Sequence, residues 1–241
     1  MKRVVDIALA AMVLVVLSPV LVVVSILIWA QDRRSPFYIA DRVGRDSKPF
    51  RMVKFRSMVV NADKTGVDST GANDPRITSI GKFVRRTKLD EVPQMWNVLK
   101  GEMSLVGPRP NVPREVALYT DLERQLLDVR PGITDYASIV FADEGDILAD
   151  KADPDIAYHQ LIRPGKNRLG LFYVSNHTVF TDVRLLWLTV VNAVHREKAL
   201  AGCAAALRKR HAPPELCELA TRTAALLAAP PPGSEEIVTR R

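Results

Sequence analysis

Hydrophobic and polar residues are segregated along the chain. Residues 7–30 contain no charged side chain, whereas charged residues recur throughout the rest of the sequence. An apolar run of about 20 residues is long enough to cross the roughly 30 Å hydrocarbon core of a bilayer. The pattern therefore predicts a membrane-embedded N-terminal helix followed by a domain of ordinary soluble composition. A secretory signal peptide is a poorer match, because its apolar core is only about 7–15 residues long.

Two features of the apolar run argue against a simple spanning helix. Basic residues flank it on both sides, so the positive-inside rule places both flanks in the cytoplasm. These residues are Lys2, Arg3, Arg33 and Arg34. Ser18 and Pro19 lie at the midpoint of the run, where proline removes a backbone donor and the serine hydroxyl can satisfy a freed backbone group. We therefore expect residues 1–34 to form a re-entrant helix-break-helix hairpin, with a spanning helix as the alternative.

The rest of the pattern predicts a mainly helical α+β domain over residues 35–198. Alternating residues at 37–60 predict a short β-hairpin, and the polar stretch 61–75 predicts a loop. Helical periodicity predicts helices at 77–86, 90–99, 112–129, 156–162 and 183–194, with an acidic loop at 143–155.

Two segments of this part stand apart. The helix at 183–194 is apolar nearly all round, which suits burial or an interfacial position with Trp187 at the lipid headgroups. Residues 199–241 are rich in Ala, Pro and Arg. They predict an appended helix or two and then a partly disordered tail, with no chemistry in it.

The distribution of charged residues adds a second constraint on function. The 241 residues carry a formal charge of +7, and residues 33–109 alone hold sixteen basic and eight acidic side chains. The excess follows the apolar run directly, where it can meet anionic lipid headgroups or an anionic substrate. A nucleic-acid binder is disfavoured because the chain has no recognisable binding motif. The only cysteines, Cys203 and Cys217, are too few for a disulfide framework and indicate a reducing environment.

Candidate chemistry is concentrated between Lys54 and Arg109. Basic residues lie on either side of the carboxylate pair Asp90-Glu91. This arrangement suits a phosphate ester held by guanidinium groups while a carboxylate attacks phosphorus or holds a divalent metal ion. If Asp90 caps the helix at 90–99, Pro93 occupies a position that needs no intrahelical N–H bond. Taken singly, each motif has a structural explanation; an acidic pair at a helix start is usually only a favourable first turn.

Several motifs together resemble the bacterial sugar transferase family, the monotopic phosphoglycosyl transferases. The resemblance covers roughly residues 1–195, and the block from Asp90 to Pro110 is its most specific part. The motifs are Lys54–Met58, Asp74–Thr78, Leu89–Gln94, Asn97–Pro110 and Arg130–Thr134, together with the Ser18-Pro19 break.

The resemblance implies an enzyme at the cytoplasmic face of the bacterial inner membrane. Its reaction would transfer a sugar-1-phosphate from a UDP-sugar to a polyprenol phosphate such as undecaprenyl phosphate, releasing UMP and using Mg²⁺. Asp90 matches the family nucleophile, which forms a covalent phosphosugar-aspartate. Glu91 matches its partner, a metal ligand or base, so that Asp90 and Glu91 are the expected metal ligands. Lys54, Arg56, Arg85 and Arg109 are the expected phosphate-binding residues.

The sequence departs from the usual family pattern after Thr134. Asp135–Ser138 and Phe141–Glu144 replace a polar segment associated with the donor site, so sugar specificity does not transfer. Asp143 and Glu144 can face the sugar hydroxyls or form an exposed acidic loop. The runner-up function is a catalytically idle membrane scaffold of a glycan assembly complex, and a homodimer or assembly partners remain open.

Overall fold

The computed structural model describes residues 1–62, 71 and 74–239. Most of the predicted loop at 61–75 lies outside the described residues. The elements in chain order are α1 (Lys2–Asp32), β1 (Phe37–Val43), η1 (Arg45–Ser47), β2 (Pro49–Phe55), α2 (Ser79–Arg86), η3 (Leu89–Gln94), α3 (Met95–Lys100), β3 (Ser104–Val106), α4 (Pro113–Ala117), α5 (Asp121–Arg124), η4 (Gln125–Asp128), β4 (Gly132–Thr134), α6 (Tyr136–Val140), α7 (Glu144–Leu148), α8 (Pro154–Ala157), η5 (Tyr158–Ile162), α9 (Arg163–Asn176), α10 (Val179–Val194), α11 (Arg196–Lys209) and α12 (Pro214–Thr221). The fold is mainly helical with little sheet, as the α+β prediction required.

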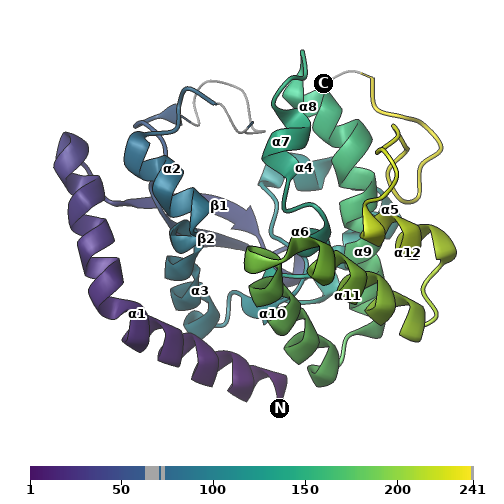
Figure 1. Ribbon diagram of the computed structural model, residues 1–241, viewed down its shortest axis with the longest axis horizontal. Coiled ribbons are helices and arrows are strands. Elements are labelled where there is room, and N and C mark those ends of the chain that lie inside the picture. The colour runs from purple at the N-terminus through teal and green to yellow at the C-terminus, as the bar shows by residue number, and fades with distance from the viewer. Residues whose placement is uncertain (63–70, 72–73, 240–241) are drawn as a thin grey trace.

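The apolar run forms one continuous helix, α1, which bends along its length (Figure 1). The sequence predicted a break at Ser18-Pro19, and in this respect the structure differs. Pro19 has no N–H for the Val15 carbonyl, and the Ser18 hydroxyl donates to that carbonyl at 2.8 Å. The predicted compensation by Ser18 is therefore confirmed, and it explains how the helix passes through proline without ending.

Both ends of α1 are docked on the rest of the protein, whereas its middle is exposed. Near the N-terminus Asp6 is buried and accepts bonds from the Ser104 hydroxyl at 2.9 Å and the Leu105 amide at 3.2 Å. Near the C-terminal end of α1, Val24 and Ile28 are buried in a small apolar cluster. Only 11% of the most apolar window of α1 is buried, and the helix is long and apolar enough to cross a membrane.

The predicted β-hairpin is confirmed. β1 and β2 pair antiparallel, with Phe37 opposite Phe55 and Val43 opposite Pro49, and η1 forms the turn between them. A second, parallel pair joins β3 to β4, with Ser104 opposite Gly132. The main apolar core lies around this second pair and is covered by α3, α6, α9, α10 and α11.

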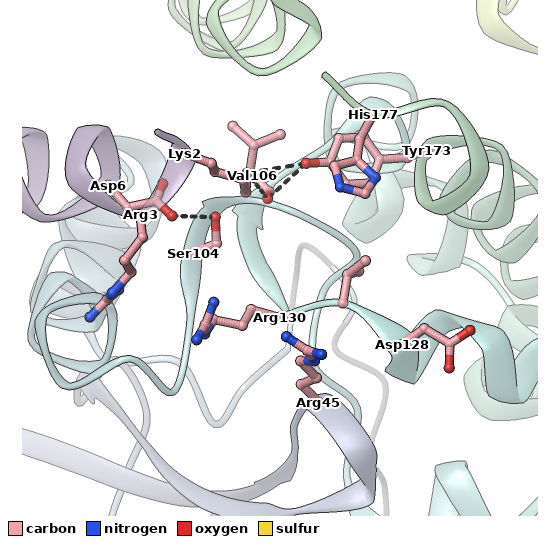
Figure 2. A pocket seen from close by; sticks show the side chains of 11 residues that line it. Lys2, Arg3, Asp6, Arg45, Ser104, Val106, Asp128, Arg130, Tyr173 and His177 are labelled. Atoms are coloured by element: carbon pink, nitrogen blue, oxygen red, sulfur yellow. Dashed lines mark hydrogen bonds between the residues drawn. The ribbon is translucent and has the colours of Figure 1, made fainter. Parts of the chain in front are cut away.

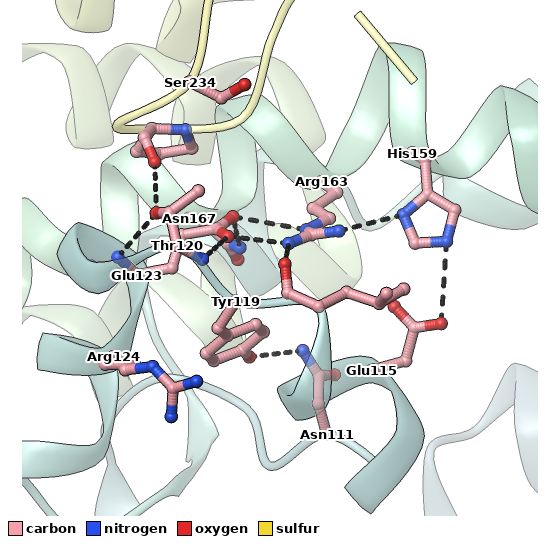
Figure 3. Close-up of polar contacts among 12 residues, drawn as sticks. Asn111, Glu115, Tyr119, Thr120, Glu123, Arg124, His159, Arg163, Asn167 and Ser234 are labelled. Carbon is pink, nitrogen blue, oxygen red and sulfur yellow. Dashed lines mark hydrogen bonds and ion pairs between the residues drawn. The ribbon is translucent and has the colours of Figure 1, made fainter. Parts of the chain in front are cut away.

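The stretch 112–129 is three short helices, α4, α5 and η4, where the sequence predicted one. Thr120 starts a new helix because its hydroxyl accepts from the Glu123 amide while the Glu123 carboxylate accepts from the Thr120 amide. Glu123 is fully buried and pairs with Arg163 of α9 at 2.6 Å (Figure 3). Asn167 donates to the same carboxylate at 2.6 Å. This long-range network, invisible to local periodicity, sets the direction of α5.

Two further predictions need correction. The acidic segment 143–155 contains the helix α7, because Leu148 is buried in the core and draws the segment into a turn. The helix predicted at 156–162 starts at Pro154 and continues through a π-helical stretch into α9. The predicted helices at 77–86 and 183–194 are confirmed as α2 and α10.

Residues beyond 198 pack on the same core. α11 buries Cys203, Ala204 and Leu207, and α12 buries Leu216 and Cys217. The irregular segment after α12 is drawn in yellow in Figure 1, and it bonds to Thr120, which caps α5, and to Gln160 of η5. Its Pro232 carbonyl accepts from the Thr120 hydroxyl at 2.5 Å (Figure 3), and its Val238 carbonyl accepts from the Gln160 amide group at 2.7 Å. α11 and α12 thus complete the core of the preceding domain.

Candidate active site

The carboxylate pair lies in the 3₁₀ helix η3, between α2 and α3. Lys88 adopts a left-handed conformation with φ 58° and is the residue from which η3 starts, so Asp90 does not cap the helix as predicted. The physical reason is Leu89, which packs against the cluster of Phe55 and Val84, so that the helix starts two residues earlier than a cap at Asp90 would allow. Asp90 and Glu91 both lie in the first turn, where the helix dipole favours negative charge.

Glu91 is held by two cations. Arg109 donates to Oε1 at 2.6 Å and to Oε2 at 3.2 Å, and Lys54 Nζ lies 3.7 Å from Oε1. Burial alone would raise the pKa of Glu91, but the Arg109 and Lys54 charges bring it well below its usual range. Glu91 is therefore ionised at neutral pH, and both of its oxygens are occupied.

The surroundings of the Asp90 carboxylate differ from those of Glu91. Its Oδ1 atom is buried and has no hydrogen-bond partner among the described residues. Burial, and next the charge of Glu91, raise the pKa of Asp90, while Lys54 and Arg85 oppose the shift. An unpaired buried carboxylate oxygen is costly, so its retention points to a ligand or a reacting atom at this position.

Arg109 is placed by the close approach of two glycines. A Cβ atom on Gly132 would lie 2.0 Å from the Gly107 nitrogen, so only glycine allows the two chains to come this close. This contact brings Arg109, two residues after Gly107, beside Ile133, whose carbonyl accepts from Nη1 at 2.9 Å. Arg109 is thus fixed at both Glu91 and the β4 backbone.

The structure brings together five of the six predicted catalytic and phosphate-binding residues. Lys54, Arg109 and Glu91 are in contact, and Arg85 is close enough to Asp90 to lower the pKa of its carboxyl group. Arg56 points elsewhere: its guanidinium binds the Asp32 carboxylate at the end of α1 and donates to the Ser35 carbonyl at 2.8 Å. Arg56 therefore anchors α1, and its role in phosphate binding stays a prediction.

One polar residue of the site was not singled out from the sequence. Gln94 is buried, with 1% of its surface exposed, and its Nε2 atom has no partner among the described residues. The available signal was its position at the end of the motif Leu89–Gln94. Among the described residues, η3 therefore holds two buried polar atoms without a hydrogen-bond partner, Oδ1 of Asp90 and Nε2 of Gln94.

The dyad fits a Mg²⁺ ion only in combination with a substrate. No cluster of three or more His, Cys, Asp or Glu side chains that could hold a metal is present within residues 1–62, 71 and 74–239. Mg²⁺ is, however, commonly bound by one or two carboxylates together with substrate phosphates. The unpaired Oδ1 of Asp90 suits such a ligand, and Glu91 becomes available if Arg109 transfers to a phosphate.

A cavity of about 270 Å³ lies at the N-terminal end of α1, away from the dyad (Figure 2). Several basic side chains line it, but they bind the protein itself. Lys2 contacts the Val106 carbonyl at 3.0 Å and Asp182 at 2.5 Å, and Arg3 donates to the Val98 carbonyl at 2.6 Å. These contacts fasten the start of α1 to β3, α10 and α3.

The fold and the site together define a class of protein. It is mainly helical, and a half-buried carboxylate pair, an arginine bound to both oxygens of Glu91 and a lysine lie close to a long apolar helix that is docked at both ends. The chain belongs to the bacterial sugar transferase family, which matches residues 1–196. The match includes α1, the dyad and Arg109, and it ends at the first residue of α11.

Three curated relatives illustrate the similarity. The UDP-galactose-lipid carrier transferase of Erwinia amylovora is 33% identical over 83% of this chain and 41% of its own length. The UDP-glucose:undecaprenyl-phosphate glucose-1-phosphate transferase of Escherichia coli (strain K12) is 35% identical over 79% of this chain and 39% of its own. The UDP-N-acetylgalactosamine-undecaprenyl-phosphate N-acetylgalactosaminephosphotransferase of Aeromonas hydrophila is 32% identical over 78% of this chain and 42% of its own. The chain thus spans about two fifths of these relatives.

Proposed function

We propose that the protein transfers a sugar-1-phosphate from a UDP-sugar to a polyprenol phosphate. The observation that carries this proposal is the asymmetry of the dyad: Glu91 is neutralised by Arg109 and Lys54, whereas Asp90 keeps a buried oxygen that has no partner among the residues the structure describes. The names of the three relatives support the reaction class, because two contain undecaprenyl-phosphate and each contains a UDP-sugar.

The proposed reaction has two displacements at one phosphorus atom. An Asp90 oxygen attacks the β-phosphorus of the UDP-sugar, the bond from that phosphorus to the bridging oxygen breaks, and UMP leaves with the bond's electron pair. An oxygen of the polyprenol phosphate then attacks the same phosphorus, which breaks the aspartyl bond and restores the carboxylate. The product is a polyprenyl-diphosphate-sugar. Splitting the transfer into two steps lets one carboxylate serve both substrates in turn.

The basic side chains around Asp90 are suited to bind the phosphate groups of the two substrates. Arg109 is suited to bind two phosphate oxygens at once, as it binds two oxygens of Glu91. Lys54 and Arg85 offset the negative charge of the donor diphosphate and of the acceptor phosphate. Mg²⁺, bound by Asp90, Glu91 and the diphosphate, would neutralise charge that develops on the leaving group.

The contacts of α1 support a membrane attachment of this site. Lys2 at the start of the helix and Asp32 at its end are both bound to the same protein body, through Asp182 and Arg56. A helix whose two ends are held by one body supports re-entry: both ends on one side of the membrane and the bent middle inserted. We place that body at the cytoplasmic face of the bacterial inner membrane, where it would meet both substrates.

α10 extends the proposed membrane contact. The Lys2–Asp182 ion pair joins its first turns to the start of α1. Its outer face is apolar: Val183, Trp187 and Val190 are 54%, 65% and 61% exposed. An exposed apolar helix face with a tryptophan suits the headgroup region of a bilayer.

Purified protein in detergent or nanodiscs tests the activity directly. UDP-glucose, UDP-galactose and UDP-N-acetylgalactosamine are mixed in turn with undecaprenyl phosphate and Mg²⁺, and released UMP is measured. We expect UMP release with at least one donor, and none with the Asp90→Asn variant. With radiolabelled donor and no acceptor, label should stay on the wild-type protein after denaturation. Absence of turnover with the whole panel would favour the idle scaffold of a glycan assembly complex.

Topology is tested with single cysteines that spare the anchoring contacts. Val4 is 70% exposed, and Arg34 lies just after α1. Cysteines at positions 4 and 34 should both react with a membrane-impermeant maleimide only after the cytoplasmic side is opened. Cys203 and Cys217 are buried and contribute little background. Labelling of the two positions from opposite sides would establish a spanning helix instead.

A further inference from the structure

The cavity at the N-terminal end of α1 is separate from the proposed catalytic site, and most of its lining is charged or polar. Its volume is about 270 Å³, and neither Asp90 nor Glu91 lines it. A cavity of roughly 150 Å³ already holds a benzene molecule, so this one has room for a phosphate group and several waters. The basic residues of its wall are Lys2, Arg3, Arg45 and Arg130, and the acidic ones are Asp6 and Asp128.

Two of these six charged groups are already matched by the protein. Lys2 forms an ion pair with Asp182 at 2.5 Å. Asp6 is buried and accepts hydrogen bonds from the Ser104 hydroxyl and the Leu105 amide. The remaining charges of the wall are three arginines and one exposed aspartate, so positive charge is in excess.

Arg45 and Arg130 bind the protein through only part of their donor groups. Arg130 donates from Nε to the Gly101 carbonyl at 3.0 Å, and its two terminal nitrogens bond to none of the described residues. Arg45 pairs with its neighbour Asp46 at 3.5 Å, and these side chains are 50% and 55% exposed. An exposed ion pair of this kind contributes little to stability. Figure 2 shows both arginines on the side of the cavity opposite Tyr173.

Arg3 and Arg130 are held at the same end of α3. Arg3 donates to the carbonyls of Val98 and Leu99 at 2.6 and 3.0 Å, whereas Arg130 binds the carbonyl of Gly101. A Cβ atom on Gly101 would lie 3.3 Å from Nη2 of Arg3. Neither guanidinium group forms an ion pair with a carboxylate in the described part of the chain. Because like charges repel, an anion bound between these groups would stabilise the arrangement.

The cavity lies where the two proposed membrane-contacting helices start. The first turns of α1 line it up to Asp6, and the charge-free run 7–30 begins at the next residue. His177 lines its other side, two residues before α10, and Phe180 in the first turn of α10 is 67% exposed. Both helix starts therefore belong at the boundary between water and hydrocarbon. Anionic lipid headgroups are concentrated at this boundary on the cytoplasmic side.

We propose that this cavity is a second phosphate-binding site and that it binds the headgroup phosphate of an anionic membrane phospholipid. Arg45 and Arg130 bind the phosphate oxygens, for which the planar guanidinium group is suited, and Arg3 adds positive charge. A lipid bound there joins the turn of the β-hairpin and the segment before β4 to the start of α1. The inference rests on the membrane attachment proposed above and adds a specific lipid contact to it.

Thermal unfolding measures this binding without any substrate. The whole chain in a neutral detergent is titrated with dihexanoyl-phosphatidylglycerol, with dihexanoyl-phosphatidylcholine and with inorganic phosphate. A ligand that binds only the native state raises the Tm as its concentration exceeds its Kd. We expect phosphatidylglycerol to raise the Tm by several degrees and the other two to have little effect. Arg45→Gln and Arg130→Gln should each weaken the apparent Kd for phosphatidylglycerol about tenfold, the scale of one charge-assisted hydrogen bond.

Three further variants separate the cavity from general effects. Arg208→Gln removes an exposed charge of α11 and should bind phosphatidylglycerol as the wild type does. Arg45→Lys keeps the charge without the two-point donor and should give an intermediate Kd. Asp90→Asn changes the dyad but not the cavity, and its Kd should equal that of the wild type. Because Arg45 is exposed, Arg45→Gln keeps the test decisive even where Arg130→Gln is too unstable to measure.

The possible results point in different directions. An unchanged Kd in Arg45→Gln, or an equal loss in Arg208→Gln, overturns the cavity as the lipid site. Loss of binding in Asp90→Asn places the lipid at the dyad and overturns it as well. A Tm increase with inorganic phosphate as large as that with lipid, and absent from both Gln variants, supports the phosphate site but overturns the lipid as its occupant.

UMP release on the same preparations separates this inference from the proposed reaction. Turnover by a wild type whose Tm does not respond to phosphatidylglycerol overturns the lipid site and leaves the transferase intact. A Tm response that depends on Arg45, with no UMP released from any donor, supports the lipid site and overturns the proposed reaction alone.

Discussion

Arg109 binds both carboxylate oxygens of Glu91, at 2.6 and 3.2 Å, and a carbonyl of β4 at 2.9 Å. One guanidinium group therefore links η3, where the dyad lies, to the parallel β-pair at the centre of the core. Within the described part of the chain, Asp90 is then the dyad member with a buried oxygen that has no hydrogen-bond partner. The geometry of the site thus depends on a planar, two-point donor, which lysine does not provide.

Arg109→Lys should therefore impair both activity and stability. Lysine keeps the charge but can occupy only one oxygen of Glu91 and loses the Ile133 contact. We expect kcat/KM for UMP release to fall by about a hundredfold, the scale of a lost transition-state donor. The free energy of unfolding should fall by about 1–3 kcal/mol, measured by urea denaturation in mild detergent. Arg124→Lys, at an exposed position of α5, is the matched control and should change neither quantity.

Asp90→Asn should separate function from stability. The variant removes the proposed nucleophile, and it also removes a carboxylate whose buried Oδ1 atom is bonded to none of the described residues. Because the pKa of Asp90 is raised in the folded protein, the ionised carboxylate opposes folding once the pH exceeds that pKa. We expect the variant to be more stable than wild type by about 1–3 kcal/mol at pH 8 and to lose this advantage as the pH falls toward 4.

Asp121→Asn serves as the control, because that carboxylate is fully exposed and should show neither effect. Thermal unfolding at several pH values gives the comparison. An Asp90→Asn variant that is less stable than wild type at pH 8 would mean that the carboxylate has a binding partner in the native protein.

The rate of UMP release should depend on pH through Asp90. Only the ionised carboxylate can attack, and burial raises its pKa, so activity should rise with pH along a limb that lies above the usual range of an aspartate. Lys54 lowers the pKa of Asp90. Removing its charge in Lys54→Met should move the acid limb of the kcat/KM profile to higher pH. Lys48→Met, on the exposed turn of the β-hairpin, should leave the profile in place. A limb displaced to lower pH would contradict the assignment to Asp90.

Local patterns predicted the elements that depend on near neighbours. The β-hairpin and the Ser18 bond to the Val15 carbonyl were both expected, because strand alternation and the missing proline N–H are properties of adjacent residues. The start of η3 was predicted wrongly because of one non-local contact, the packing of the partly buried Leu89 against Phe55 and Val84. A left-handed Lys88 is not signalled by its own side chain, since lysine has no special preference for that conformation.

The site was predictable as a set of residues but not as an arrangement. Motif resemblance selected Lys54, Asp90, Glu91 and Arg109, and the structure brings the first, third and fourth into contact. The different surroundings of Asp90 and Glu91 depend on Arg109, which reaches Glu91 because the backbones at Gly107 and Gly132 lie in close contact. Arg56 carried the same basic signal as Lys54, yet it binds Asp32. The order of charges along the sequence does not show which acidic residue a basic side chain will bind when the two lie 24 residues apart.

The pairing of Glu123 with Arg163 is a second long-range contact, and it yields the last prediction. Arg163 donates to both Glu123 oxygens and to the Leu118 carbonyl, and Glu123 has no exposed surface. Arg163→Met leaves this carboxylate buried with only Asn167 and backbone donors, so the free energy of unfolding should fall by about 3–5 kcal/mol. The double variant Glu123→Leu, Arg163→Met should recover most of that loss, because no buried charge remains. Urea denaturation of the three proteins decides this, and a double variant as unstable as Arg163→Met would show that the hydrogen bonds of Glu123, rather than its burial, dominate.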